Sequence, residues 1–173
     1  MAQFVDRMIR AGKLEARLFG EVEADPRATG QALGVVLLSS VAAGIGYVVQ
    51  GGLAGLVLGM VVALLGWYVW VSITYIVGTK LLPMPQTSTS HGALVRTLGF
   101  ASAPGLLRIL GVLPGFTGIA FLVAAVWMLV ATVIAAQQAL DYTSTTRAGG
   151  VCVVGWLVQV LIMLPLFVLF GGD

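Results

Sequence analysis

The chain has 173 residues, of which 59% are hydrophobic and 9% are charged. A soluble domain of this length cannot bury so much apolar surface. The composition therefore indicates a polytopic membrane protein, with apolar runs of the ~20 residues that cross a bilayer as a helix. The formal net charge of +2 gives no reason to expect a nucleic-acid partner. With a single Cys and a single His, we expect no internal disulfide, no metal site built on these residue types and no cofactor.

Residues 1–25 are predicted to form a cytoplasmic amphipathic helix next to a membrane domain of residues 26–173. At about 100° per residue, one arc of residues 2–23 is apolar and the opposite arc carries most of the charges. The apolar arc consists of Phe4, Met8, Ala11, Leu18, Phe19 and Val22. The cations of this segment are Arg7, Arg10, Lys13 and Arg17. Leu14 and Glu15 fall on the wrong arcs for one continuous amphipathic helix.

A basic amphipathic helix beside a membrane span can lie in the headgroup layer with its apolar face down. The four cations are therefore candidate membrane-surface residues. The alternative, which the sequence leaves open, is that this helix packs on the cytoplasmic ends of the bundle.

Five apolar segments follow, and they predict an all-α bundle of five transmembrane helices. Asp25 and Pro26 are typical of a helix start, with Asp as the N-cap and Pro at the first helical position. The apolar segments are separated by a glycine turn at residues 50–52, a Pro- and Ser/Thr-rich loop at residues 83–90, Pro114–Gly115, and a polar loop at residues 141–147. The expected spans cover about residues 28–49, 53–79, 91–113, 116–140 and 149–170.

The cations predict the orientation of the chain. With the N-terminus in the cytoplasm, all nine Lys and Arg residues except Arg108 fall on the cytoplasmic side or in the helical turns beside it. This is the distribution expected of a multi-pass protein in a cytoplasmic membrane. Five spans then place the C-terminus outside.

The third expected span carries Arg96 and Arg108 near its opposite ends, and Pro104–Gly105 in its interior. Because charge at membrane depth is costly, each arginine either contacts an anion or lipid headgroup or extends to the nearer interface. Pro104 removes a backbone donor, which predicts at least a kink. Broken helices also line sites in transporters, so a continuous crossing and a broken helix both stay open.

Small residues recur every fourth position in the second expected span, at Gly51, Gly55, Gly59 and Ala63. Such a row allows another helix to approach closely. The neighbouring helix is expected to belong to the same chain, and the alternative is a second copy in a homo-oligomer.

Residues 96–105 resemble the signature of the Yip1 domain family at its third span, which is Gly-aromatic-x-x-x-Pro. The matching positions are Gly99, Phe100 and Pro104. The order of elements, Trp127 in the fourth span and the Thr/Ser loop before the fifth also resemble bacterial members, and the resemblance covers about residues 1–171. It implies a five-span protein of the bacterial inner membrane with a membrane-organising or scaffold role.

The chain lacks the Asp-Leu-Tyr-Gly-Pro motif and the long N-terminal region of eukaryotic Yip1 proteins, which are linked to Rab GTPases. Both absences argue against a Rab-type GTPase as a partner. No nucleophile–base pair, phosphate loop or metal spacing is recognisable, so we expect a non-enzymatic protein. Its expected partners are the lipid bilayer and another membrane protein or a second copy. The alternative function is a small transporter or channel subunit that uses the broken third span.

Overall fold

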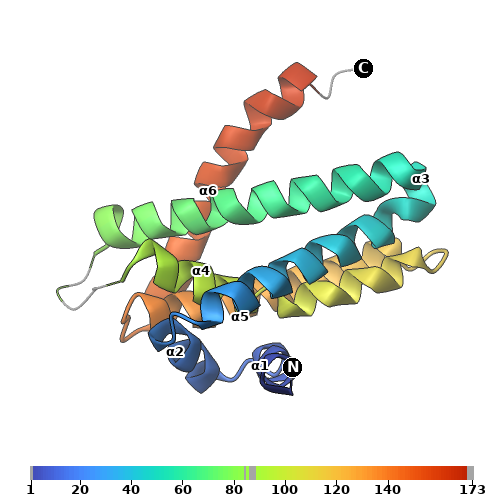
Figure 1. Ribbon diagram of the computed structural model, residues 1–173. Helices are drawn as coiled ribbons and strands as arrows, with labels where there is room; N and C mark the ends of the chain where they lie inside the picture. The colour runs from blue at the N-terminus through green and yellow to red at the C-terminus, as the bar shows by residue number, and fades with distance from the viewer. Residues whose placement is uncertain (1, 84, 86–88, 171–173) are drawn as a thin grey trace.

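The computed structural model describes residues 2–83, 85 and 89–170, and every regular element in them is a helix (Figure 1). Side chains are described as far as Leu161, apart from those of residues 47 and 49–51 and of the gaps in these ranges. The predicted all-α class is confirmed. The elements are α1 (Ala2–Gly12), α2 (Ala16–Ala24), α3 (Ala28–Ile76), η1 (Val77–Leu81), α4 (His91–Phe100), η2 (Ala103–Val112), α5 (Thr117–Ala139) and α6 (Thr145–Phe170).

α3 is a helical hairpin, because its backbone reverses at Gly52 (Figure 1). Gly52 has φ 59° and ψ −149°, a conformation that glycine adopts without a Cβ penalty. The first limb of α3 (Ala28–Gly46) and its second limb (from Gly52) are in close contact where Gly44 faces the Leu56 carbonyl, with no room for a side chain. The glycine turn predicted at residues 50–52 thus joins two antiparallel helices.

Three helices among the described residues are long and apolar enough to cross a membrane: Ala28–Gly46, Gly52–Leu81 and Thr117–Ala139. α4 and η2 make a fourth candidate together, bent by 43°. Of α6, Thr145–Leu161 qualifies as a shorter apolar helix, and residues 162–170 of the predicted fifth span have no described side chains. By length and composition, these helices are compatible with a multi-pass membrane protein.

The third expected span is a broken helix. α4 ends at Phe100, and η2, a 3₁₀-helix, begins at Ala103 with Pro104 in its first turn. Proline suits this position because the first amides of a helix have no partner within the helix. The break therefore lies at Ala101–Ser102, just before the Pro104–Gly105 pair where the sequence suggests it.

The N-terminal segment is two helices, which corrects the prediction of one helix over residues 2–23. Leu14 has φ 62°. The amides of Leu14 and Glu15 donate to the carbonyl oxygens of Ala11 and Arg10, at 3.0 and 3.1 Å, which is the Schellman arrangement that ends helices. Leu14 and Glu15, which fall on the wrong arcs of one continuous helix, both find partners because the helix breaks here. Leu14 packs against the core, and Glu15 pairs with Arg10 at 2.9 Å.

α6 begins at Thr145 instead of residue 149, inside the loop predicted for residues 141–147. The carbonyl oxygen of Ser144 accepts hydrogen bonds from the amides of Arg147 and Ala148, at 3.2 and 3.3 Å. Arg147 therefore lies in the first turn of α6, on an exposed face. Arg147 therefore lies on a helix and not in a loop, but it stays at the end of the bundle where α5 ends and α6 begins.

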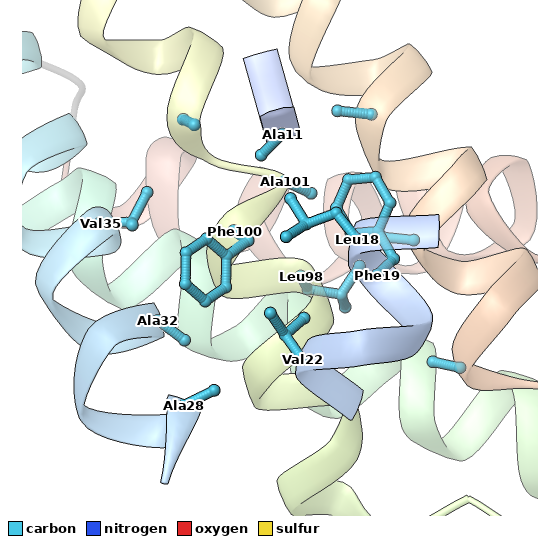
Figure 2. Close-up of a cluster of buried hydrophobic side chains, with 14 of the residues drawn as sticks. Ala11, Leu18, Phe19, Val22, Ala28, Ala32, Val35, Leu98, Phe100 and Ala101 are labelled. Atoms are coloured by element: carbon cyan, nitrogen blue, oxygen red, sulfur yellow. The ribbon is translucent and has the colours of Figure 1, made fainter. Parts of the chain in front are cut away.

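The main core lies where α2 meets α3 and α4. Leu18, Phe19 and Val22 of α2 are fully buried. Figure 2 shows Phe100 with α3 on one side and the α2 side chains on the other. Burying each of these side chains contributes about 1.5–3 kcal/mol, so α2 is an integral part of the bundle. Of the two alternatives that the sequence leaves open for the apolar arc, α2 therefore shows packing on the bundle.

Candidate functional site: a cavity beside the broken span

A cavity of about 710 Å³ lies between the second limb of α3, the α4–η2 pair, α5 and α6. Its volume is in the range of small-molecule and lipid sites. Trp67, Trp70 and Trp156, three of the four tryptophans in the sequence, contribute to its wall. The rest of the wall is mainly aliphatic, with a few polar side chains. The cavity therefore suits a ligand that is largely apolar.

Arg108 of η2 is the charged side chain among the described residues of this wall. Its guanidinium donates to the Met128 sulfur at 3.3 Å and lies 5.7 Å from the centre of the Phe121 ring. A cation over an aromatic face is attracted to it. Both contacts are on α5, and Met128 lies near the middle of that helix. Arg108 thus turns into the bundle, whereas the sequence favoured an extension toward the interface.

The depth of Arg108 follows from its neighbour on α3. The carbonyl of Arg108 lies against Gly46, where a side chain would collide with it. Gly46 is six residues before the turn at Gly52, or about 9 Å along the helix axis. Arg108 therefore sits close to the end of the bundle at which the α3 hairpin turns. By the predicted orientation, this is the outer end.

The other polar groups of the wall are Ser102, Thr132 and Gln159. Ser102 and Arg108 flank Pro104, so the break in the third span places polar side chains on either side of the proline. The hydroxyl of Ser102 donates to the Leu98 carbonyl at 3.2 Å, back into α4. The break thus brings a charged group and a hydroxyl to one side of the cavity.

The residues that carry the family resemblance are packing positions in this structure. A Cβ on Gly99 would lie 2.8 Å from the Cβ of Ala32, so only glycine lets α4 approach the first limb of α3 this closely. Phe100 is fully buried in the core, and Pro104 is buried in η2. Gly99 and Phe100 hold the broken span against α3, and none of the three residues lines the cavity.

Arg96 is held by α2 and lies away from the cavity wall. Its Nε donates to the Val22 carbonyl at 3.0 Å, and its Nη2 donates to the Glu23 carbonyl. These carbonyls belong to the last turn of α2, which carries the negative end of the helix dipole. The structure gives this arginine a docking contact within the protein, where the sequence suggested a lipid headgroup or an interface.

Two of the four predicted membrane-surface cations are engaged by other residues of the N-terminal segment or of α3. Arg7 is 7% exposed, donates to Gln31 at 2.9 Å and pairs with Asp25 at 3.0 Å, which lowers the pKa of Asp25. Arg10 pairs with Glu21 at 2.8 Å, and this contact holds the pKa of Glu21 below its usual range. Lys13 and Arg17 are exposed, and no ion pair to either occurs among the described residues.

The row of small residues on the second limb of α3 has mixed surroundings. Gly55 and Gly59 are half-buried, Ala63 lines the cavity, and the surroundings of Gly51 are outside the described set. Only 11% of the most apolar window of this limb is buried. Little of this window is therefore fully covered by the described part of the chain, and the packing partner of the row stays a prediction.

The sequence did not single out the cavity itself. Trp67, Trp70 and Met128 are not among the residues that the sequence predicts at a site. A signal was present, because two tryptophans three residues apart share one face of a helix. The cavity, however, needs four segments of the chain, and no local pattern brings them together. Within the described residues, no three His, Cys, Asp or Glu side chains are grouped as a metal site would require.

Comparison of the chain with protein-family models, with curated proteins and with solved structures finds no match. The resemblance to the Yip1 domain therefore depends on the residues quoted from the sequence.

Proposed function

We propose that this chain is a non-enzymatic, five-span membrane protein of Yip1 type that organises the bacterial inner membrane, with its N-terminus in the cytoplasm. The cation distribution, the three long apolar helices and the bent α4–η2 pair support the topology. α6 supplies the fifth span in this proposal. The role is supported by the way in which the N-terminal segment joins the bundle.

The observation that carries the proposal is that α1 and α2 pack against one side of the bundle. The indole nitrogen of Trp127, on α5, donates to the Gly12 carbonyl at 2.9 Å, so the turn between α1 and α2 lies beside a membrane helix. On α1, Val5 and Ile9 are 51% and 52% exposed, one helical turn apart. An amphipathic helix held beside the middle of α5, with two apolar side chains uncovered, displaces lipid on one side of the bundle, which favours altered lipid packing or curvature.

Vesicle reconstitution tests this role. We expect the purified chain to reduce the mean diameter of phosphatidylcholine vesicles in cryo-electron micrographs as the protein-to-lipid ratio rises. A Val5→Ser, Ile9→Ser double variant should lose most of this effect. Leu53→Ser is the matched control, because Leu53 is 80% exposed at the far end of the α3 hairpin. Equal vesicle diameters with and without the wild-type chain would contradict the proposal.

Cysteine labelling tests the topology. In a Cys152→Ser background, Thr89→Cys and Pro114→Cys place single thiols at opposite ends of the bent third span. A membrane-impermeant maleimide added to intact spheroplasts should label the thiol at position 114, and should label that at position 89 only after lysis. Labelling of both thiols from the same side would exclude a crossing by α4 and η2.

Transport is a second candidate, because the cavity lies beside the broken span and Arg108 provides a positive site in it. Discontinuous helices next to a central site recur in transporters. Proteoliposomes should then take up a small anion such as phosphate, and Arg108→Gln should stop the uptake. Uptake no faster than in empty vesicles would leave the non-transport proposal as the better one.

A further inference from the structure

We infer that the cavity is a binding site for one anionic phospholipid of the outer leaflet, with its phosphate at Arg108 and an acyl chain among the tryptophans. This inference rests on the proposed membrane topology and gives the membrane-organising function a ligand class. Three observations lead to it: the chemistry of the wall, the exposure of its rim, and the depth of the charge.

The wall combines one cation with a long apolar surface. The described lining residues include no Asp or Glu, and the sequence has none between Asp25 and Asp141. The wall is therefore neutral or positive throughout. A guanidinium binds phosphate oxygens in a bidentate manner, and the other polar groups of the wall, Ser102, Thr132 and Gln159, are uncharged. An inorganic anion would occupy only the positive region at Arg108 and leave the indole rings of the wall uncovered. A phospholipid would occupy the positive region with its headgroup and the apolar region with its acyl chain.

The rim shows how a lipid would enter. Several residues that line the cavity also have highly exposed side chains, including Val62 at 59%, Val153 at 59% and Trp156 at 58%. They lie on the second limb of α3 and on α6. Figure 1 shows α6 running obliquely across that limb, so these two helices do not pack along their whole lengths. The cavity is thus open sideways, toward the region that acyl chains occupy in a bilayer.

The depth of Arg108 means that a bound phosphate would be drawn below the headgroup layer. The Arg108 backbone lies about 9 Å along the helix from the hairpin turn, the headgroup region is about 5–7 Å thick on each side of the hydrocarbon core, and the guanidinium reaches further in, to Met128. Trp67 and Trp70 lie nearer the middle of the second limb, on the same wall. A lipid whose phosphate contacts Arg108 therefore places its acyl chain beside these indole rings.

Tryptophan fluorescence tests the inference directly. The full chain is placed in phosphatidylcholine nanodiscs that contain a rising small fraction of phosphatidylglycerol with brominated acyl chains, which quench indole fluorescence on contact. We expect saturable quenching at a few mole per cent of the brominated lipid. Trp67→Phe, Trp70→Phe and Trp156→Phe should together remove this component, because these three tryptophans line the cavity. Trp127→Phe is the matched control, because Trp127 lies outside the cavity wall and should contribute only a linear background.

The charge is tested at Arg108. Arg108→Gln should raise the half-saturating fraction about tenfold, the equivalent of one hydrogen bond to a charged group. Arg108→Lys keeps the charge and should bind with intermediate affinity. If either variant fails to fold, Ala125→Phe fills the cavity without touching the cation and should remove saturation. Arg147→Gln, exposed in the first turn of α6, should change nothing.

Other results would overturn the inference. Brominated phosphatidylcholine that quenches as saturably as phosphatidylglycerol would show that Arg108 selects no headgroup. Displacement of the bound lipid by millimolar inorganic phosphate would show a simple anion site. A failure of the lipid-binding inference can be distinguished from a failure of the proposed membrane-organising function. A chain that shrinks neutral vesicles but binds no anionic lipid saturably overturns only the inference, and the reverse pair of results overturns only the curvature role.

Discussion

Arg96, in the second turn of α4, donates from its Nε to the backbone carbonyl of Val22, 3.0 Å away and 74 residues earlier in the chain. A second nitrogen of the same guanidinium donates to the Glu23 carbonyl. The arginine thus satisfies two of the carbonyls that the last turn of a helix leaves without partners. Together with the buried side chains of α2, it fastens the N-terminal segment to the start of the third span.

Arg96→Gln should loosen α2. Hydrogen bonds to charged groups contribute roughly 1.5–3 kcal/mol each, so the variant should unfold at a clearly lower temperature in detergent. Trypsin should also cleave faster after Arg17, in α2, because cleavage requires that helix to open. Arg147→Gln is the control, since it removes an exposed arginine from another helix. Unchanged melting and cleavage for Arg96→Gln would mean that apolar burial alone docks α2.

Local features of this fold could be predicted from the sequence. Gly52 sits in a glycine pair between two apolar runs, and only glycine takes its backbone conformation readily, so the hairpin turn was visible. α5 nearly coincides with its expected span, because it is an uninterrupted apolar run. Leu14 and Glu15 marked the break in the N-terminal segment, as the two residues that fitted neither arc of a single helix.

Contacts between distant segments could not be predicted in the same way. The carbonyls that receive the Arg96 side chain are backbone groups, and every residue has one. Likewise, Arg108 was recognised as an embedded charge, but its neighbours Met128 and Phe121 are fixed by how η2 packs on α5. The cavity exists because four segments meet around it, so its wall follows from tertiary structure alone.

Glycine at position 99 should be required for close packing of α4 on α3. In Gly99→Ala, the new Cβ would lie 2.8 Å from the Cβ of Ala32 and 3.1 Å from its carbonyl oxygen. The helices must move apart, which should lower the free energy of unfolding by roughly 1–3 kcal/mol. Thermal unfolding in detergent measures the loss. Gly150→Ala, on α6 with no atom within 4 Å of the new Cβ, should be neutral or slightly stabilising.

A second substitution separates crowding from other effects of Gly99→Ala. Ala32→Gly in the same chain removes the side chain that the new methyl group meets. The double variant should recover part of the lost stability, and the remaining loss reflects the contact with the Ala32 backbone. A double variant less stable than the sum of the two single changes would contradict the packing explanation.

Acid should release the N-terminal segment. The pKa of Glu21 is lowered by Arg10, and that of Asp25 is lowered by Arg7. A lowered pKa means that the ion pair contributes stability fully above the ordinary values of 4.5 and 3.8, and loses it as the pH falls through the lower folded values. Hydrogen exchange in α2, corrected for its intrinsic pH dependence, should therefore accelerate below about pH 4.

Protonation of Glu23 should have the opposite effect on stability from protonation of Glu21 and Asp25. Its pKa is raised by burial and by the charge of Asp141, so the folded chain favours the protonated form and loses stability as the pH rises through that value. Glu23→Gln should therefore slow exchange in α2 at neutral pH and leave the acid release in place. Glu21→Gln should weaken docking at neutral pH and reduce the acid effect. Identical pH profiles for the wild type and both variants would contradict these assignments.

Substitutions in the row of small residues on the second limb of α3 should show whether the chain associates with a second copy. If a helix of the same chain packs on the row, Gly55→Leu and Gly59→Leu should lower the melting temperature without changing the particle mass in detergent. If a second copy packs there, the variants should become folded monomers. Light scattering after size-exclusion chromatography distinguishes the two. Unchanged stability and unchanged mass would show that the row faces lipid.

The loop between α5 and α6 should depend on the hydroxyl of Tyr142. This side chain is 4% exposed, and its Oη donates to the carbonyls of Gly78 and Leu82, at 3.2 and 2.7 Å. Both carbonyls belong to the end of the second limb of α3, where η1 replaces the α-helix and leaves acceptors without helical partners. Burial raises the pKa of Tyr142, so the phenol keeps its proton and remains a donor.

Tyr142→Phe removes the donor and leaves two partly buried carbonyls with one partner fewer. We expect a loss of about 1–3 kcal/mol in the free energy of unfolding, from a change of one oxygen atom. Tyr68→Phe is the matched control, because Tyr68 is 58% exposed on the same limb of α3, and it should cost much less. Equal effects of the two substitutions would show that the phenol does not link this loop to η1.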